Sequence, residues 1–230
     1  MKKKFITEFI LLSFLGGLTS LSLPPFNLFI INFFTFSIFF GLLFKNLNKK
    51  IEKKIFFFYG WFFGFGYFFT NLYWITISLS FDKNFSFLIP LALIFIPSFL
   101  ALFYGSITLI FYLFNPKNIL SAFFSFSVFF GIVEFIRGSI LTGFPWNLIV
   151  YSFSKNLSFL SILSLIGTYS LNLIVISFFT APAIYILRKS KKEIGVCIFL
   201  VLLPIIFFTH GNFQKKQFKN KELEKLPYTI

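Results

Sequence analysis

The stretch of this sequence with the most chemically active residues is VEFIRGSILTGFPWN, residues 133–147. Glu134 and Arg137 are three residues apart, so on a helix they share one face and can neutralise each other. An ionisable side chain at the centre of a bilayer costs roughly 2.5 to 3.5 kcal/mol unless it is paired or reaches the interface. Two interpretations stay open: a structural ion pair that fixes a helix end, or a polar lining for a headgroup or reacting group.

The residues after this pair predict a turn that leaves the helix. Gly138 and Gly143 let the backbone turn, and Phe144, Pro145 and Trp146 fix the turn and present an indole. Tryptophan favours the membrane–water interface because its ring is apolar while its N–H can still find a partner. We therefore expect this segment to lie along the outer face of a membrane, as a plain anchor or as part of a binding site.

A second stretch, GWFFGFGYFFTNLYWI at 60–75, combines packing and polar signals. Gly60 and Gly64 have the small-xxx-small spacing that permits close helix packing. Polar and interfacial groups end the same helix: Asn71, Tyr73 and Trp74. We expect these three to line a cavity near Trp146.

The remaining reactive side chains do not form a catalytic set. Cys197 has no base beside it, and a thiolate nucleophile needs a cationic or helix-terminal setting, so it is predicted to be an inert membrane thiol. His210 is the only histidine and cannot make a metal site alone. A phosphate loop, a nucleophile elbow and an H-E-x-x-H motif do not occur in the sequence. The sequence predicts no catalytic residue, no metal site and no cofactor.

Composition places these residues in a membrane. The chain has 230 residues, of which 57% are hydrophobic and 12% charged, more apolar side chains than a soluble core of this length can bury. The net charge of +14 sits in short clusters between apolar runs, which indicates orientation in a bilayer and not nucleic-acid binding. We therefore expect an integral membrane protein with no nucleic-acid partner.

The apolar runs predict an all-α fold. Crossing the hydrocarbon takes roughly 20 residues, and charged, Pro-rich and Asn-rich segments divide the chain into seven candidates. They cover residues 5–23, 27–44, 55–80, 86–114, 119–137, 157–187 and 194–209. The runs lack the alternation of barrel strands, so we expect a polytopic bundle of about seven transmembrane helices. The first run is expected to stay as an uncleaved helix, because Glu8 interrupts it and no A-x-A site follows.

Prolines and asparagines predict where helices stop or bend. Pro24 and Pro25 should end the first helix, and the segments 81–86 and 115–118 should separate later ones. Four further prolines lie inside apolar runs and are expected to kink them: Pro90, Pro97, Pro182 and Pro204.

Basic residues predict the orientation. With the amino terminus in the cytoplasm, the outer loops hold only Lys83 and Lys155, as the positive-inside rule requires. The cytoplasmic segments then hold Lys2, Lys3, Lys4, Lys45, Lys49, Lys50, Lys53, Lys54, Lys117, Arg188, Lys189, Lys191 and Lys192. The tail at 211–230 would lie outside despite its lysines. Either the last run, only about 16 residues long, fails to span, or the tail leads into a long translocated domain.

The sequence resembles one family of membrane enzymes. Glu134-Phe-Ile-Arg137-Gly138 followed by Thr142-Gly143-Phe144-Pro145-Trp146 resembles the E-x-x-R-G…T-G-F-P-W signature of bacterial apolipoprotein N-acyltransferases. Three further elements occur in the family's order: Leu23-Pro24-Pro25-Phe26, then Gly64-x-Gly66…Asn71-Leu72-Tyr73-Trp74-Ile75, then Gly167-x-Tyr169-Ser170. The resemblance extends to about residue 210.

This resemblance implies a reaction and its partners. It implies a helical bundle in the inner membrane, with a cytoplasmic N-terminus, a periplasmic C-terminal tail and a nitrilase-like domain before a last helix. The reaction moves an acyl chain from a membrane phospholipid to an enzyme thiol, and then to the α-amino group of a diacylglyceryl lipoprotein. The partners are thus the phospholipid donor, the lipoprotein acceptor and, if the enzyme is split, a separate nitrilase-like catalytic chain.

The resemblance also implies a division of the chain. Residues 1–210 form the transmembrane domain, and 211–230 form a basic polar tail leading toward a nitrilase-like domain that the sequence does not contain. That domain's Glu, Lys and Cys have no counterpart, so we expect a truncated or split enzyme that is inactive by itself. Its substrate-binding candidates face lipid: Glu134, Arg137, Gly143, Phe144, Pro145, Trp146, Asn71, Tyr73 and Trp74.

Two other functions stay open. A small membrane transporter would place Glu134 and Arg137 in a polar pathway, and it calls for polar residues stacked through the midplane on several helices, of which few are present. A noncatalytic lipid-binding scaffold would share the fold of the enzyme and differ only in lacking a catalytic partner.

Overall fold

The protein is described by a computed structural model that covers residues 2–47, 49, 51–140 and 143–220. Seven helices in this part have 17 or more residues: α1 (Lys2–Ser20), α2 (Ile31–Leu47), α3 (Lys53–Asn71), α5 (Ile89–Phe114), α6 (Ile119–Ser139), α9 (Thr168–Leu187) and α10 (Lys191–Lys219). The short helices are α4 (Ile75–Ser80), η1 (Lys83–Leu88), η2 (Ile149–Phe153), α7 (Leu157–Leu160) and α8 (Leu163–Ile166). No strand occurs among the described residues, so the all-α prediction is confirmed for them.

In the described part of the chain, four helical segments are long and apolar enough to cross a bilayer: Lys83–Phe114, Ile119–Ser139, Thr168–Leu187 and Lys191–Lys219. Helix α2 has only 17 residues, and α1 and α3 begin with consecutive lysines. The count of seven crossings therefore stays a prediction. Lys50, Thr142 and the last ten residues of the tail, which also entered the sequence predictions, lie outside the described residues.

Glycines bring α3 into backbone contact with helices on two sides. A Cβ atom on Gly60 would overlap the carbonyl oxygen of Tyr104, and one on Gly64 would lie 2.8 Å from the Cβ of Tyr104, so both glycines face α5. Gly66 faces α1 instead, where a Cβ would overlap the carbonyl oxygen of Ser13. The predicted packing role of Gly60 and Gly64 is confirmed, because no other residue type allows this approach.

The core of the bundle consists largely of phenylalanines. Phe39 of α2 stacks on Phe63 of α3 with ring centroids 4.2 Å apart, and it meets Phe126 of α6 edge to face at 5.8 Å. Such offset and T-shaped pairs add about 0.5 to 1.5 kcal/mol each beyond the burial of the rings. Glu8 of α1 is accommodated at the edge of this core, where it accepts a hydrogen bond of 2.5 Å from the Tyr59 hydroxyl.

Three predicted breaks between helices are confirmed. Pro24 and Pro25 lie in the connection between α1 and α2, and the peptide bond between them is cis. Residues 81–86 connect α4 to α5 through η1. Asn115 ends α5 with a φ of 48°, and the side chain of Asn118 caps α6 by accepting a hydrogen bond from the Ser121 N–H at 2.8 Å.

Two predicted helices are interrupted, and in both cases the prediction of one continuous helix was wrong. The run 157–187 contains α7, α8 and α9, because Gly167 adopts a φ of 77° that ends α8 before α9 begins. The run 55–80 divides into α3 and α4 after Asn71. Both interruptions lie at the end of the bundle that carries the candidate site.

Two further predictions need correction. Pro90 lies in the first turn of α5, where its missing N–H has no helical partner to lose, so it begins the helix and does not kink it. Pro97, Pro182 and Pro204 do lie inside α5, α9 and α10. The last helix is also longer than expected: α10 has 29 residues and continues through the predicted boundary at residue 210 to Lys219.

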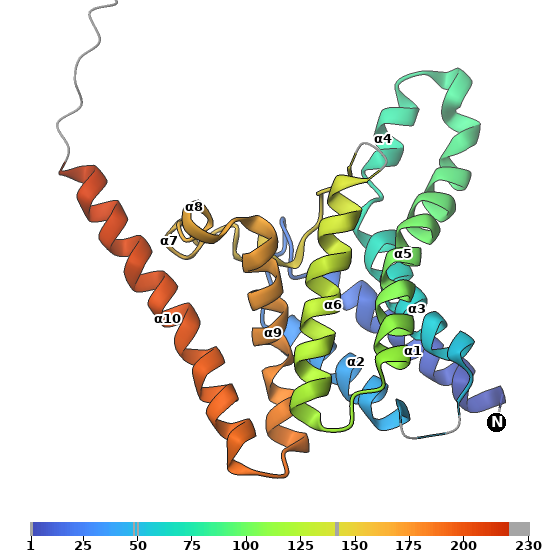
Figure 1. Cartoon of the computed structure of the whole chain (residues 1–230). Helices are drawn as coiled ribbons and strands as arrows, with labels where there is room; N and C mark the ends of the chain where they lie inside the picture. The colour runs from blue at the N-terminus through green and yellow to red at the C-terminus, as the bar shows by residue number, and fades with distance from the viewer. Residues whose placement is uncertain (1, 48, 50, 141–142, 221–230) are drawn as a thin grey trace, which may run out of the picture.

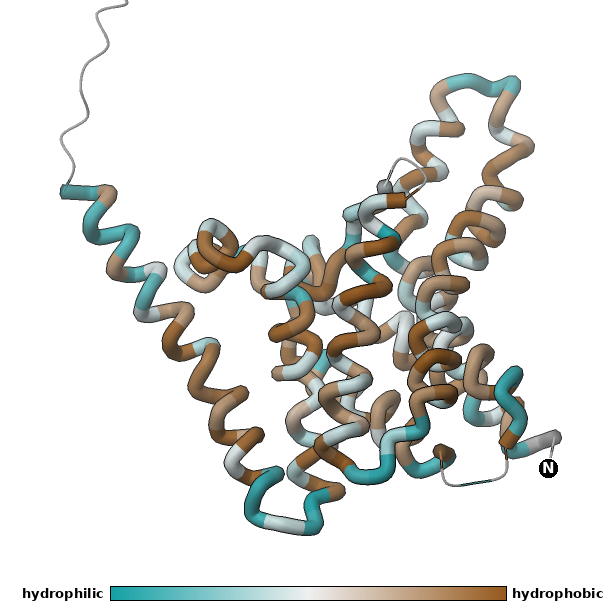
Figure 2. The backbone as a smooth tube through the Cα atoms, in the orientation of Figure 1, coloured by the Kyte–Doolittle hydropathy of each residue, from teal (hydrophilic) through white to brown (hydrophobic). Residues whose placement is uncertain are grey.

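The two ends of the bundle differ (Figure 1). The N-terminus and the α2–α3, α5–α6 and α9–α10 connections lie at the lower end, where the tube in Figure 2 is hydrophilic. At the upper end, α4, η1 and the start of α5 rise as an arm on one side, and α10 stands at the opposite edge. The candidate residues belong to this upper end.

Candidate functional site

The ion pair predicted on α6 forms and is buried. Two of the three side-chain nitrogens of Arg137, Nε and Nη2, donate hydrogen bonds to Oε2 of Glu134. The distance from Nε to Oε2 is 2.9 Å. Each of the two residues is 1% exposed. Their spacing on the helix accounts for the contact, because residues three apart lie on the same face.

The remaining nitrogen of Arg137 holds the segment that follows α6. Its Nη1 donates to the carbonyl oxygens of Phe144 at 2.7 Å and Trp146 at 3.2 Å. The Tyr67 hydroxyl of α3 donates to the carbonyl oxygen of Asn147 at 2.8 Å. Two buried side chains thus hold three carbonyls of an irregular segment, those of Phe144, Trp146 and Asn147, in agreement with the interpretation of a structural ion pair.

Glycines allow the turn that these bonds hold. Gly143 has a φ of 78°, a conformation that other residues rarely adopt. Gly138 lies against the hydroxyl of Tyr169, where a Cβ would overlap it. The Gly167-x-Tyr169 element therefore packs against the end of α6.

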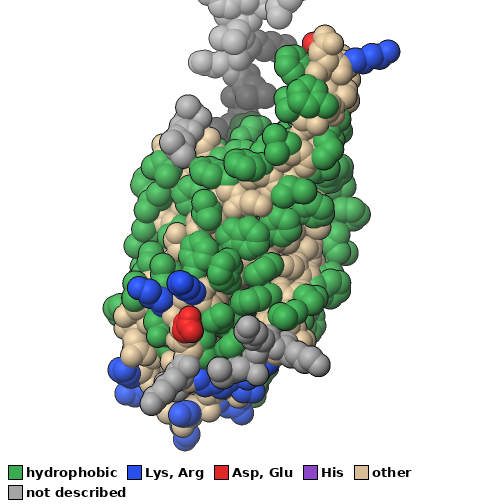
Figure 3. Space-filling view, turned by 90° about the vertical axis from the view of Figure 1, so that its right-hand side faces the viewer, with side chains coloured by type: hydrophobic (Ala, Val, Ile, Leu, Met, Phe, Trp, Pro, Cys, Tyr) green, Lys and Arg blue, Asp and Glu red, His purple; other side chains and the backbone are tan. Residues whose placement is uncertain are grey.

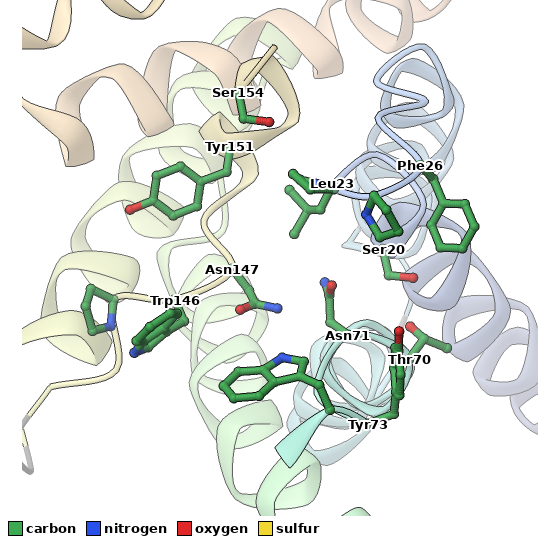
Figure 4. Close-up of a pocket in the computed structure, with 14 residues that line it drawn as sticks. Ser20, Leu23, Phe26, Thr70, Asn71, Tyr73, Trp146, Asn147, Tyr151 and Ser154 are labelled. Carbon is green, nitrogen blue, oxygen red and sulfur yellow. The ribbon is translucent and has the colours of Figure 1, made fainter. Parts of the chain in front are cut away.

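Three segments that are distant in the sequence surround one cavity of about 760 Å³ (Figure 4). They are the α1–α2 connection, the end of α3 and the segment that follows α6. The lining residues are Ser20, Leu23, Pro24, Pro25, Phe26, Thr70, Asn71, Tyr73, Trp74, Pro145, Trp146, Asn147, Tyr151 and Ser154. Five predicted site residues are among them: Asn71, Tyr73, Trp74, Pro145 and Trp146.

The cavity wall combines aromatic rings with neutral polar groups. The indoles of Trp74 and Trp146 lie with ring centroids 6.0 Å apart and are 42% and 58% exposed. The amide side chains of Asn71 and Asn147 point toward the same space (Figure 4). Burial raises the pKa of the Tyr151 phenol above its ordinary value, so this group stays a neutral hydrogen-bond donor. Such a wall suits a ligand with an apolar chain and a polar head.

Four predicted site residues do not line this cavity. Glu134 is buried within the bundle. Arg137, Gly143 and Phe144 line a separate groove of about 310 Å³ against the first half of α5. Arg137, paired with Glu134, positions the cavity wall through the carbonyls of Phe144 and Trp146, and neither residue lines the cavity.

Several cavity residues escaped prediction. Ser20 and Thr70 are small polar residues inside apolar runs and carry no local signal. Tyr151 and Ser154 belong to η2 and its end, which Asn172 of α9 holds by accepting a hydrogen bond from the Val150 N–H at 2.9 Å. The motif around Leu23 and Phe26 did carry a signal, because it belongs to the resemblance described above.

Cys197 lies away from the cavity, at the contact between α10 and α9. It is partly buried, and its Sγ lies 3.5 Å from the carbonyl oxygen of Ala181. This contact places the thiol between two helices, and its predicted inertness stays a prediction.

Fold and cavity together define an all-helical bundle with four candidate membrane spans among its described residues and an aromatic cavity at one end. Residues 15–181 match the family model described as "Apolipoprotein N-acyltransferase N-terminal domain", and this range includes all four elements of the resemblance. The chain therefore belongs to the apolipoprotein N-acyltransferase family, with which it shares this N-terminal domain.

Individual relatives agree. The chain is 38% identical over 195 residues to an apolipoprotein N-acyltransferase of Rickettsia prowazekii, covering 84% of this chain and 38% of the relative. It is 32% identical over 203 residues to one of Brucella melitensis, covering 84% and 37%. A relative from Rhodopseudomonas palustris is 35% identical over 174 residues, covering 74% and 32%. The chain spans about a third of the length of the curated relatives it matches.

Proposed function

We propose that this chain is the membrane part of an apolipoprotein N-acyltransferase. The reaction transfers an acyl chain from a phospholipid to the N-terminal amine of a diacylglyceryl-cysteine lipoprotein. One observation carries the proposal: three of the family's sequence elements, far apart in the chain, meet around a single cavity. A family signature that served helix packing alone would not need to converge on a cavity.

The proposal gives the cavity a binding role. Both substrates are lipids, so they reach the protein by lateral diffusion in the bilayer. The exposed indoles of Trp74 and Trp146 suit the level of the headgroups, where an apolar ring and a polar N–H are both accommodated. Asn71, Asn147 and Tyr151 can hydrogen-bond to ester or headgroup oxygens.

In this proposal the described residues orient the lipid and do not react with it. The resemblance places the acyl-accepting thiol in a nitrilase-like catalytic part, where thioester formation divides a difficult amide synthesis into two easier steps. The cavity would hold the donor ester close to that thiol. Orientation of this kind can supply several kcal/mol of the rate enhancement, on the order of 7 to 11 in the best intramolecular cases.

We also propose an inner-membrane location with seven crossings, a cytoplasmic N-terminus and a periplasmic cavity. Basic side chains gather at the lower end of the face in Figure 3, and hydrophobic side chains cover its middle. A reporter inserted between Asn115 and Asn118 should then lie in the cytoplasm, and one fused after Lys219 should lie in the periplasm. A cytoplasmic location of the second reporter would contradict the proposal.

A hybrid enzyme tests the reaction. This chain would replace the matching segment of the Rickettsia prowazekii relative, and acylation of a diacylglyceryl peptide would be measured in membranes. We expect activity, and Trp146→Phe should reduce it about tenfold, the effect of roughly 1.4 kcal/mol. Trp61→Phe is the matched control, because the Trp61 indole donates to the Ser98 carbonyl within the α3–α5 contact and does not line the cavity.

The results separate the proposal from its alternatives. A hybrid that binds phospholipid but never acylates the peptide would favour a noncatalytic scaffold. Equal losses from Trp146→Phe and Trp61→Phe, at equal protein levels, would show that the cavity indole has no special role.

A further inference from the structure

A second groove lies at the opposite end of α3 from the candidate site. It has a volume of about 660 Å³ and is formed by α3 and α5. Two lysines, Lys53 and Lys54, stand at one end, and four apolar side chains line the rest: Phe57, Phe58, Leu109 and Leu113. The groove thus has a cationic head and an apolar body.

The two lysines are free to bind a ligand. Both are exposed, and neither forms an ion pair or side-chain hydrogen bond among the described residues. The ion pairs among the described residues are Lys4–Glu8 and Glu134–Arg137. Two positive charges side by side, neither of them in an ion pair with a described residue, attract an anion.

The backbone at the same place also favours an anion. Lys53 and Lys54 are the first residues of α3, and the side chain of Glu52 makes no capping hydrogen bond. The first turn contains no acidic residue. The N–H groups at this helix start are therefore without a side-chain acceptor, and the positive end of the helix dipole adds to the lysine charges.

The apolar body of the groove distinguishes a lipid from a soluble anion. Phe58 and Leu113 are 41% and 65% exposed, so the groove presents apolar side chains to its surroundings. A phosphate with an acyl chain would cover both the charges and these side chains, whereas inorganic phosphate would leave the apolar part uncovered.

We propose that this groove binds an anionic phospholipid from the leaflet at the basic end of the bundle. Its phosphate contacts Lys53, Lys54 and the start of α3, and one acyl chain lies along Phe57 and Leu113. This site is separate from the cavity at the other end of α3, and it does not depend on the proposed acyltransferase function.

Native mass spectrometry of the full chain tests the proposal. The protein would be released from nanodiscs containing equal amounts of phosphatidylglycerol and phosphatidylethanolamine, and the retained lipids would be counted. We expect the wild type to retain phosphatidylglycerol preferentially. Lys53→Ala/Lys54→Ala should reduce this preference about 25-fold, the product of roughly fivefold per lysine near a lipid surface.

A matched control is present at the same end of the bundle. Lys191 and Lys192 are also consecutive lysines that begin a helix, but Ser190 and Glu193 close that helix start with a capping box, and neither lysine lines the groove. Lys191→Ala/Lys192→Ala should leave the lipid preference within about twofold of wild type. Equal losses in the two double variants would overturn the proposal, because they would reflect net charge alone.

A third variant tests the apolar part of the groove. Leu113→Trp fills the groove from its exposed side without entering the core, and it should lower retained phosphatidylglycerol while both lysines remain. A thermal unfolding midpoint close to that of the wild type would verify that each variant is folded. Retention of both lipids in equal amounts by the wild type, or a dimer that buries Phe58 and Leu113, would refute the proposal.

Discussion

Replacing Arg137 with methionine should be among the most destabilising single changes in this protein. The substitution leaves the Glu134 carboxylate buried without its partner, which costs about 3 to 5 kcal/mol. The carbonyls of Phe144 and Trp146 also lose their donor, which adds roughly 1 kcal/mol. The expected total of about 4 to 6 kcal/mol is a large part of the roughly 5 to 15 kcal/mol that stabilises a typical fold.

A double-mutant cycle isolates the interaction. Glu134→Leu alone should also cost about 3 to 5 kcal/mol, because it leaves the Arg137 charge uncompensated. The double variant, Glu134→Leu/Arg137→Met, should cost only about 1 to 3 kcal/mol. It removes both charges and replaces the two side chains with apolar ones of similar volume. Unfolding in mixed micelles with increasing dodecyl sulfate, followed by circular dichroism, measures these free energies.

The Lys4–Glu8 pair at the other end, of which only the lysine is exposed, provides the control. Lys4 and Glu8 lie 3.9 Å apart, and the Lys4 side chain is 60% exposed, so Lys4→Met should cost about 0 to 1 kcal/mol. A cost of less than about 1 kcal/mol for Arg137→Met, or a cost of the double variant equal to the sum of the two single costs, would contradict this prediction.

Three further predictions concern the packing around the site. Gly66→Ala should lower the free energy of unfolding by about 2 kcal/mol or more, because its Cβ would overlap a carbonyl oxygen of α1, whereas Gly195→Ala has open space and should be neutral or stabilising in the same unfolding assay. Tyr67→Phe removes the donor to the Asn147 carbonyl and should cost about 1 to 3 kcal/mol, with faster hydrogen–deuterium exchange confined to residues 143–150; unchanged exchange there would contradict the assignment. Asn172→Ala removes the acceptor for the Val150 N–H and should increase proteolysis in η2 while the helical content stays constant; resistance equal to that of the wild type would show that η2 is held by other contacts.

Sequence reasoning predicted the helices well, because each apolar run has a length that only a helix can use in a bilayer. It failed where a single backbone conformation decided the outcome, as at Gly167, whose positive φ divides an otherwise uniform apolar run. Hydropathy cannot detect such a position, since the residues on both sides are apolar.

The candidate site was predicted only in part, because some of its residues carry no local signal in the sequence. Trp146 and Trp74 carry a local signal, interfacial tryptophan, and the structure brings their rings together. Ser20 and Tyr151 carry none, because their place at the cavity depends on how α1 and η2 fold back against α3. Arg137 was predicted as a site residue from its charge, yet its bonds point to the protein backbone, a distinction that requires the tertiary structure.

The two walls of the cavity differ in how they can move. The wall carried by α3 belongs to a helix wedged between α1 and α5 at glycine contacts, so it can shift only if three helices shift together. The facing wall, residues 144–147, has no regular secondary structure and is held by hydrogen bonds from the side chains of Arg137 and Tyr67. A bulky ligand should therefore enter by displacing residues 144–147, while the wall formed by α3 keeps its position.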